Sequence, residues 1–176
     1  MKLSKFDYYS DYVAYPVAIV AIGAVAMIGH AARENVHWLM VAAGGFALWT
    51  FLEYILHRVV LHGRNYFAPM HGEHHAAPVA LVGTPTWISM LTLAGAVLAP
   101  LWLWLGFHRA SGLFVGVISG YLWYGAVHHL IHHRRDAPYM AKLRARHMRH
   151  HYSPRAGNFG VTTAVWDHIF GTTIRR

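Results

Sequence analysis

The sequence contains no cysteine among its 176 residues. This absence excludes disulfides, thiolate zinc sites, iron–sulfur clusters and cysteine nucleophiles. Charged side chains are also scarce, at 12% of residues, and only seven of them are acidic. Apolar residues make up 56%, which is more than soluble domains usually carry. The composition therefore favours a membrane protein over a soluble one.

The formal net charge is +8. Nucleic-acid binding proteins are often basic, but basic residues in such an apolar chain more often follow the positive-inside rule or contact anionic lipid head groups. We therefore expect the membrane as a partner and no nucleic acid.

Four apolar runs are each long enough, at roughly 20 residues, to cross or nearly cross a hydrocarbon core of about 30 Å. They cover residues 13–32, 36–56, 85–105 and 111–127. Tryptophan and tyrosine gather at their ends, as in interfacial belts. A signal peptide is the alternative for the first run, but its length and the acidic residues before it argue against one. The sequence predicts an all-α integral membrane protein, with residues 1–176 forming a single membrane domain.

The basic residues are divided unevenly among the connections. With the N-terminus inside, the two outer loops contain only Arg33 and Arg109 of the 15 lysines and arginines. The positive-inside rule then predicts a multi-pass protein with both termini in the cytoplasm. The segments 57–84 and 128–176 would form a helical cap on the same side.

Gly112, Gly116 and Gly120 form a repeat of small residues in the fourth run. Such a stripe allows another helix backbone to approach closely. Two interpretations are open: the stripe packs against a neighbouring helix of the same chain, or it forms the seam of a homodimer.

Most of the 16 histidines lie in the predicted cytoplasmic cap, in four motifs. The motifs are HRVVLH (57–62), HGEHH (71–75), HHLIHH (128–133) and HMRHH (147–151). Residues three or four apart share a helix face, so each H-x-x-H-H motif directs three imidazoles into one space. His57 and His62 are five apart, which requires the helix to end or bend nearby. His30, His37, His108 and His168 are interpreted as isolated polar residues.

Imidazole is the commonest metal-binding side chain at neutral pH, so these motifs favour a metal site over a pH-sensing surface. They contain more nitrogens than one zinc or iron ion can bind, which predicts two metal ions. Glu53 and Glu73 are the nearest acids, each a ligand or a hydrogen-bond partner of a ligand. Asp136 and Asp167 are further candidates for such partners.

Several segments resemble the fatty acid hydroxylase superfamily, also called the sterol desaturase family, of membrane di-iron oxygenases. EYILHRVVLH is similar to its E-x-x-x-H-R-x-x-x-H segment, and HGEHHAAP to its second histidine box. VHHLIHH and HMRHHY resemble its H-x-x-x-H-H and H-x-x-H-H pair. NFGVTTAVWDHIFGT resembles its C-terminal segment. The resemblance covers about residues 49–175.

The resemblance implies two iron ions, which zinc or another divalent metal could replace in a crystal. The implied ligands are His57, His62, His71, His74, His75, His128, His132, His147, His150 and His151. His133 would be a ligand or the hydrogen-bond partner of one, and His129 a spectator. The alternative register, in which His129 and His133 replace His128 and His132, stays open.

The resemblance also implies O2-dependent hydroxylation of a C–H bond in a fatty acyl chain or membrane lipid. A separate electron donor would be needed, such as ferredoxin or cytochrome b5 with its reductase. The basic stretch Lys142–Arg149 would dock an acidic donor or contact lipid head groups. A carotenoid-ring hydroxylase, a sterol oxidase or a desaturase with the same site is the first alternative. A non-enzymatic metal transporter or sensor is the second, although among the acids only Glu53 lies within a predicted span.

Overall fold

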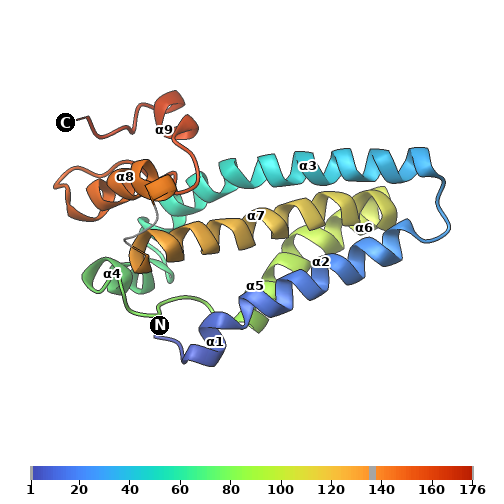
Figure 1. Cartoon of the computed structure of the whole chain (residues 1–176), viewed down its shortest axis with the longest axis horizontal. Helices are drawn as coiled ribbons and strands as arrows, with labels where there is room; N and C mark the ends of the chain where they lie inside the picture. The colour runs from blue at the N-terminus through green and yellow to red at the C-terminus, as the bar shows by residue number, and fades with distance from the viewer. Residues whose placement is uncertain (1, 135–137, 176) are drawn as a thin grey trace. The chain divides into compact units, whose positions relative to one another are not determined.

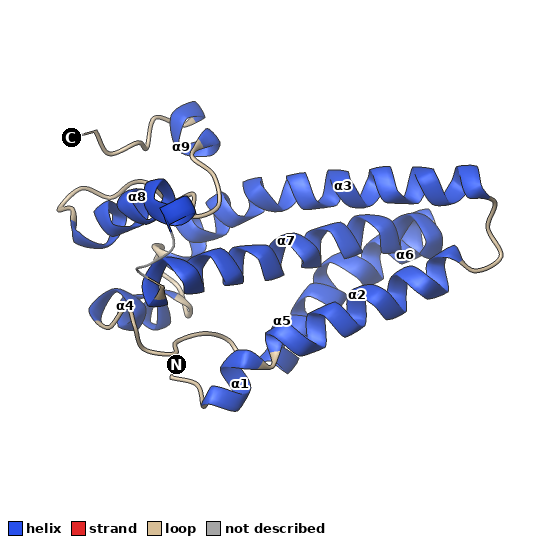
Figure 2. Ribbon diagram, in the orientation of Figure 1, coloured by secondary structure: helices blue, strands red, loops and turns tan. Residues whose placement is uncertain are grey.

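The computed structural model describes residues 2–134 and 138–175. Within these residues every regular element is a helix, and the only β pairing is an isolated antiparallel bridge between Lys2 and Val82 (Figure 2). The predicted all-α fold is therefore confirmed for the described part of the chain. Asp136, one of the candidate hydrogen-bond partners, lies outside it.

Figure 1 shows the order and arrangement of the helices. They are α1 (Lys5–Tyr9), α2 (Asp11–Met27), α3 (Ala32–Ile55), the π-helix η1 (Leu56–Leu61), α4 (Ala68–Ala76), α5 (Thr86–Leu93), the π-helix η2 (Ala94–Leu98), α6 (Ala99–Leu105), α7 (Phe107–His133), the 3-10 helix η3 (Pro138–Met140), α8 (Ala141–Tyr152) and α9 (Val165–Ile169). Gly106 ends α6 at a positive φ of 77°, a conformation that costs glycine little.

Four helical stretches are long and apolar enough to cross a membrane, as predicted. They are Lys5–Met27, Ala32–Leu61, Thr86–Leu105 and Phe107–His133. The second and fourth continue beyond the apolar runs that predicted them, because helical hydrogen bonding does not stop where hydrophobicity does. His57, His128 and His132 therefore stand on the last turns of spanning helices.

The contacts divide the chain into two compact units. The first comprises Met1–Lys2, Thr50–Val82 and Trp123–Arg176, and it contains all four histidine motifs. The second comprises Leu3–Trp49 and Gly83–Leu122. That these units form one membrane domain stays a prediction.

In the second unit, the glycine stripe packs against α3 of the same chain. A Cβ atom added at Gly116 would collide with the carbonyl oxygen of Ala42 and with Gly45. A Cβ atom at Gly120 would likewise collide with the Trp49 side chain, and one at Gly112 would lie only 3.2 Å from Trp38. Close backbone approach between α3 and α7 therefore accounts for the stripe, which is the first of its two interpretations.

Apolar side chains and a few buried hydrogen bonds hold the rest of the second unit together. Tyr15, Phe114 and Ile118 form a buried cluster. The Tyr15 hydroxyl donates to Ser89 at 2.9 Å, and the Trp38 indole donates to Ser111 at 3.0 Å. Such bonds satisfy polar groups that a lipid environment could not.

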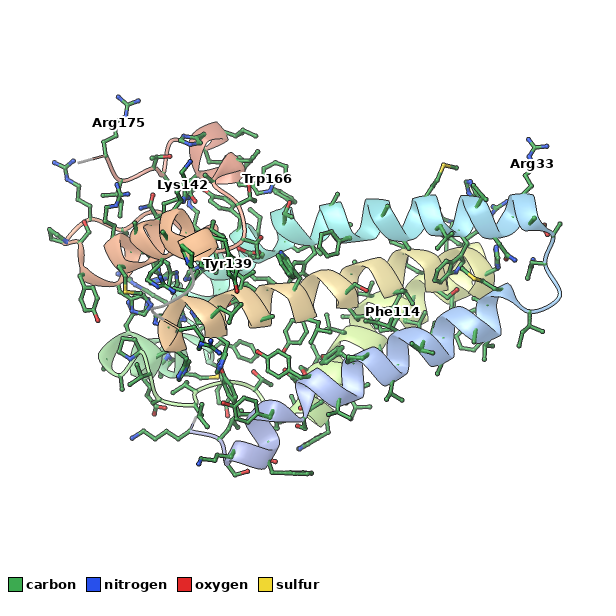
Figure 3. The ribbon with its side chains drawn as sticks, viewed as in Figure 1. Arg33, Phe114, Tyr139, Lys142, Trp166 and Arg175 are labelled. Atoms are coloured by element: carbon green, nitrogen blue, oxygen red, sulfur yellow. The ribbon has the colours of Figure 1, made fainter. Side chains whose placement is uncertain are left out.

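In the first unit, α9 contacts the C-terminal end of α3 through a hydrogen bond and aromatic packing. The Trp166 indole donates to the Thr50 hydroxyl at 3.0 Å, and its ring lies 4.8 Å from that of Phe51 (Figure 3). This anchor brings the segment before α9 back toward the histidines.

Candidate metal centre

The structure gathers the ten predicted ligand histidines into two groups of five, both within the first unit. Site A comprises His57, His62, His71, His75 and His150, and site B comprises His74, His128, His132, His147 and His151. In each site one nitrogen from every ring lies within 4.8 Å of the others. No further group of this kind was found among residues 2–134 and 138–175.

Each H-x-x-H-H motif contributes to both sites. Histidines four apart on α4, His71 and His75, belong to site A, while His74 belongs to site B. On α8 the roles are reversed: His147 and His151 belong to site B, and His150 to site A. A helix turns by about 100° per residue, so i and i+4 point one way while i+3 is offset to the side. One short motif thereby serves two neighbouring sites, and the prediction that each motif directs all three imidazoles into one space was wrong.

The spacing of His57 and His62 is explained by the π-helix η1. Its widened turn bonds residue i to residue i+5, and the His62 amide donates to the His57 carbonyl at 3.2 Å. Both rings then lie on one side, with centroids 5.2 Å apart. The helix ends at Leu61, as the five-residue spacing requires, and its last six residues form a π-helix.

On α7 the structure brings His128 and His132 into site B. His129 and His133 instead stack on each other, with ring centroids 4.4 Å apart. His129 and His133 therefore occupy neither site in this arrangement.

The ring nitrogens fit a bound cation better than a hydrogen-bond network. Nε2 of His71 lies 3.0 Å from Nε2 of His57, His62 and His75 alike. Nε2 of His147 is likewise 2.9–3.0 Å from three other rings of site B. A neutral ring nitrogen has either one proton or one lone pair, so it cannot form three such hydrogen bonds.

These distances do suit a metal ion. Two nitrogens bound at right angles, each about 2.1 Å from one ion, lie about 3.0 Å from each other. In addition, Nε2 of His74 is buried and has no hydrogen-bond partner in the described part of the chain. The ten histidines thus form two sets of donors that could each hold one ion.

Burial keeps the site histidines neutral, as metal binding requires. Desolvation lowers the pKa of His74 to about 3, and those of His75 and His150 to about 4. It also lowers the pKa of His147 well below its usual range. Repulsion from neighbouring imidazoles adds to each effect. Each of these rings therefore keeps a lone pair available at neutral pH.

A loop that sequence reasoning did not assign to the site orients two rings of site A. Nδ1 of His57 lies 2.5 Å from the Phe159 carbonyl oxygen, and Nδ1 of His150 lies 2.8 Å from that of Gly157. A carbonyl accepts only, so both Nδ1 atoms carry the proton and both Nε2 atoms present lone pairs. The NFG sequence belongs to the segment that resembles the family, but nothing local in it indicates this contact.

The buried carboxylates act on this loop. Glu53 accepts hydrogen bonds from the Val161 amide (2.5 Å) and from the amide and hydroxyl of Thr162 (2.9 and 2.6 Å). Asp167 accepts from the amides of Phe159 (2.8 Å) and Gly160 (2.9 Å). Both acids therefore influence His57 and His150 indirectly, by hydrogen-bonding the loop whose carbonyl groups contact these two rings.

The remaining candidates for hydrogen-bond partners of the ligands stand on α4 and α7. Glu73 is exposed on α4, and His133 is half-buried beside His129. Two histidines interpreted as isolated, His30 and His108, stack on each other in the second unit, with ring centroids 3.9 Å apart.

Fold and site together define a multi-pass membrane protein with a histidine-rich candidate metal centre. The sequence profile of the fatty acid hydroxylase family matches residues 42–172, and the chain belongs to this family. The predicted membership is thus confirmed.

Three relatives illustrate the similarity. A dihydroceramide fatty acyl 2-hydroxylase of Arabidopsis thaliana is 31% identical over 173 residues, covering 89% of this chain and 69% of the relative. A ceramide very long chain fatty acid hydroxylase of Saccharomyces cerevisiae is 37% identical, covering 73% of this chain and 36% of the relative. The fatty acid 2-hydroxylase of Homo sapiens is 30% identical, covering 73% and 38%. The chain thus spans about two thirds of the first relative and little more than a third of the other two.

A solved structure shares the fold. It is titled full-length Scs7p with only the hydroxylase domain visible, and it matches with a TM-score of 0.79 at 24% identity. The match covers 96% of this chain and 67% of that one.

Proposed function

We propose that this protein is an O2-dependent di-iron hydroxylase that oxidises carbon 2 of a fatty acyl chain carried by a membrane lipid. The observation that supports this most directly is the pair of five-histidine groups with converging ring nitrogens. The position of hydroxylation is taken from relatives that are named fatty acyl or fatty acid 2-hydroxylases. Bound iron would supply the oxidising power for an unactivated C–H bond, using O2 and two external electrons.

The residues of the chain itself bind and orient the metal ions and exclude water. Sites A and B would each hold one ion through neutral imidazoles. Leu56 and Val59 flank His57 on η1, and their side chains are 40% and 57% exposed. This apolar surface at the end of a spanning helix would let an acyl chain approach the site without entering water, which protects a reactive oxidant.

The metal centre and both termini would face the cytoplasm, on the basis of the uneven distribution of lysine and arginine. Electrons would come from a separate protein such as ferredoxin or cytochrome b5. Lys142 is exposed on α8, the helix that supplies His147 and His150 (Figure 3). An acidic donor could dock against this basic helix.

No structural observation favours the alternatives over this function. The relatives are named for fatty acyl chains and not for carotenoids or sterols. For a transporter, the spans should contain polar groups free to bind cargo. Glu53 is instead bonded to the loop that contains Thr162.

Mass spectrometry of total lipid tests the proposal. Cells that express the protein under 18-O2 should accumulate 2-hydroxyacyl lipids that contain one labelled oxygen, and cells expressing the His74→Ala variant should not. Labelled hydroxycarotenoid or sterol with unchanged acyl chains would refute the proposed substrate. An unlabelled hydroxyl group would refute O2 as the oxygen source.

A further inference from the structure

The two candidate metal sites differ in the hydrogen bonds that the Nδ1 atoms of their imidazole rings make. In site A, His57 and His150 donate through Nδ1 to backbone carbonyls of Phe159 and Gly157. In site B, Nδ1 of His147 and Nδ1 of His151 are buried without a hydrogen-bond partner in the described part of the chain. The protein thus orients two ligands of site A and leaves two ligands of site B without this support.

The loop that supplies these carbonyls, Gly157–Thr162, is itself fixed at several points. Asp167 is fully buried and binds two consecutive loop amides, those of Phe159 and Gly160. Arg146 donates to the same carboxylate at 2.9 Å, and its side chain is mostly buried. Asp167 therefore holds the loop from the side opposite to the histidines.

Glu53 and Asn158 complete this support. Glu53 reaches from α3 to the far end of the loop, where it binds Val161 and Thr162. Asn158 is buried at a positive φ of 54°, where its Oδ1 accepts from the Ile174 amide at 3.0 Å. Asparagine tolerates this left-handed conformation better than most residues. The rigid loop leaves the two carbonyls little freedom to move.

We propose that the two metal sites are unequal: site A retains its ion more tightly than site B, because the Gly157–Thr162 loop positions only site A ligands. Asp167 and Glu53 are positioning residues that act through this loop. The inference rests on the proposed two-ion centre. Outer hydrogen-bond partners of ligand histidines typically change metal affinity by about 10- to 100-fold, which sets the expected difference.

Release of zinc from the full chain measures this difference without relying on catalysis. The purified protein is loaded with zinc in detergent, and a coloured chelator then reports release over time. Wild-type protein should lose its two ions in two phases, with rates separated by about 10-fold or more. His75→Gln should remove the slow phase and His132→Gln the fast one. Release of both ions in a single phase would overturn the proposal.

Variants of the positioning residues test the role of the loop. Asp167→Asn should speed the slow phase by about 10- to 100-fold and leave the fast phase unchanged. Glu53→Ala should act in the same direction. Glu53→Gln should restore most of the slow phase, since its amide oxygen can still accept from Val161 and Thr162. A purely structural role would speed both phases equally, and that result would contradict the proposal.

Ser111→Ala provides the matched control. It removes the hydroxyl that accepts a buried hydrogen bond from the Trp38 indole, on the first turns of α7. Ser111 belongs to the second unit, which contains none of the ten ligand histidines. Both phases should be unchanged.

Failure of the inference can be distinguished from failure of the proposed function. Binding of fewer than two zinc ions per chain would refute the two-ion centre and the inference with it. Two ions that leave at equal rates would refute only the inference, and 18-O2 labelling of acyl lipids would be unaffected.

Discussion

At the scale of single residues, the imidazole rings depend on which of their two nitrogens is protonated. His57 and His150 each donate through Nδ1 to a backbone carbonyl, so their Nε2 lone pairs face the centre of site A. His129 and His133 have the same chemistry, but they stack on each other instead of joining a site. The position of each histidine on its helix, and not the residue type, therefore decides whether its ring joins a site.

His74→Ala or His150→Ala should abolish hydroxylation, because each removes one of five nitrogens around a proposed ion. The protein should still insert into the membrane, since its four spans are unchanged. Product formation by the purified variants, with metal content measured in parallel, checks this expectation. His129→Ala is the matched control and should retain both ions. Turnover near the wild-type level in either ligand variant would contradict the assignment.

At the scale of elements, the helices supply pairs of histidines, and the loop after α8 orients two of the rings, those of His57 and His150. The periodicity of α4, α7 and α8 could be read from the sequence, and it correctly predicted that histidines four apart share a site. It wrongly placed the histidine three apart in the same space, because that ring is offset toward the other site. The π-turn at η1 was not predicted, because one additional residue per turn leaves no compositional signature. The five-residue spacing of His57 and His62 indicated only that an ordinary helix could not continue.

Adjacent glycines on α3 should respond differently to substitution. A Cβ atom at Gly45 would collide with the Leu113 carbonyl on α7, whereas one at Gly44 would meet nothing within 4 Å. Gly45→Ala should therefore lower the thermal midpoint in detergent. Gly44→Ala should leave it unchanged or raise stability by about 0.5–1 kcal/mol, because alanine favours the helix. Equal midpoints for the two variants would argue against close α3–α7 packing.

At the scale of the whole molecule, an apolar chain carries a cluster of imidazoles whose charged forms are disfavoured by burial. The carboxylates of Glu53 and Asp167 are bonded to loop amides. A cluster without carboxylate ligands leaves the charge of bound metal largely uncompensated. Water or hydroxide would supply the remaining ligands.

Acidification should destabilise the protein. The pKa values of His74, His75 and His150 are lowered to about 3 to 4, from a reference value of 6.5. Between about pH 6.5 and 3 the unfolded chain therefore takes up protons that the folded chain does not. The contribution of these histidines to the free energy of unfolding is fully present above this window, and it is lost as the pH falls through it. Protons also compete with bound metal, which acts in the same direction.

Thermal unfolding in detergent at pH 7.5, 6 and 5 measures this effect, and the midpoint should fall at each step. A midpoint that is constant from pH 7.5 to 5 would contradict buried, neutral imidazoles. Metal content measured on the same samples should fall in parallel.

The four spans, the histidine motifs and the family could all be predicted from the amino-acid sequence. These features depend on composition and on spacings of a few residues, which are visible locally. The same local information could not choose between His128 with His132 and His129 with His133, nor between the two interpretations of the glycine stripe.

The division of the histidines between sites A and B, and the contacts that orient them, depend on how the chain folds in three dimensions. The contact of His57 with Phe159 spans 102 residues, and that of Glu53 with Thr162 spans 109. Such contacts arise when the chain returns to itself, with Trp166 anchoring α9 on α3. No local pattern specifies them, because their stabilisation comes from groups that meet only after the helices have packed.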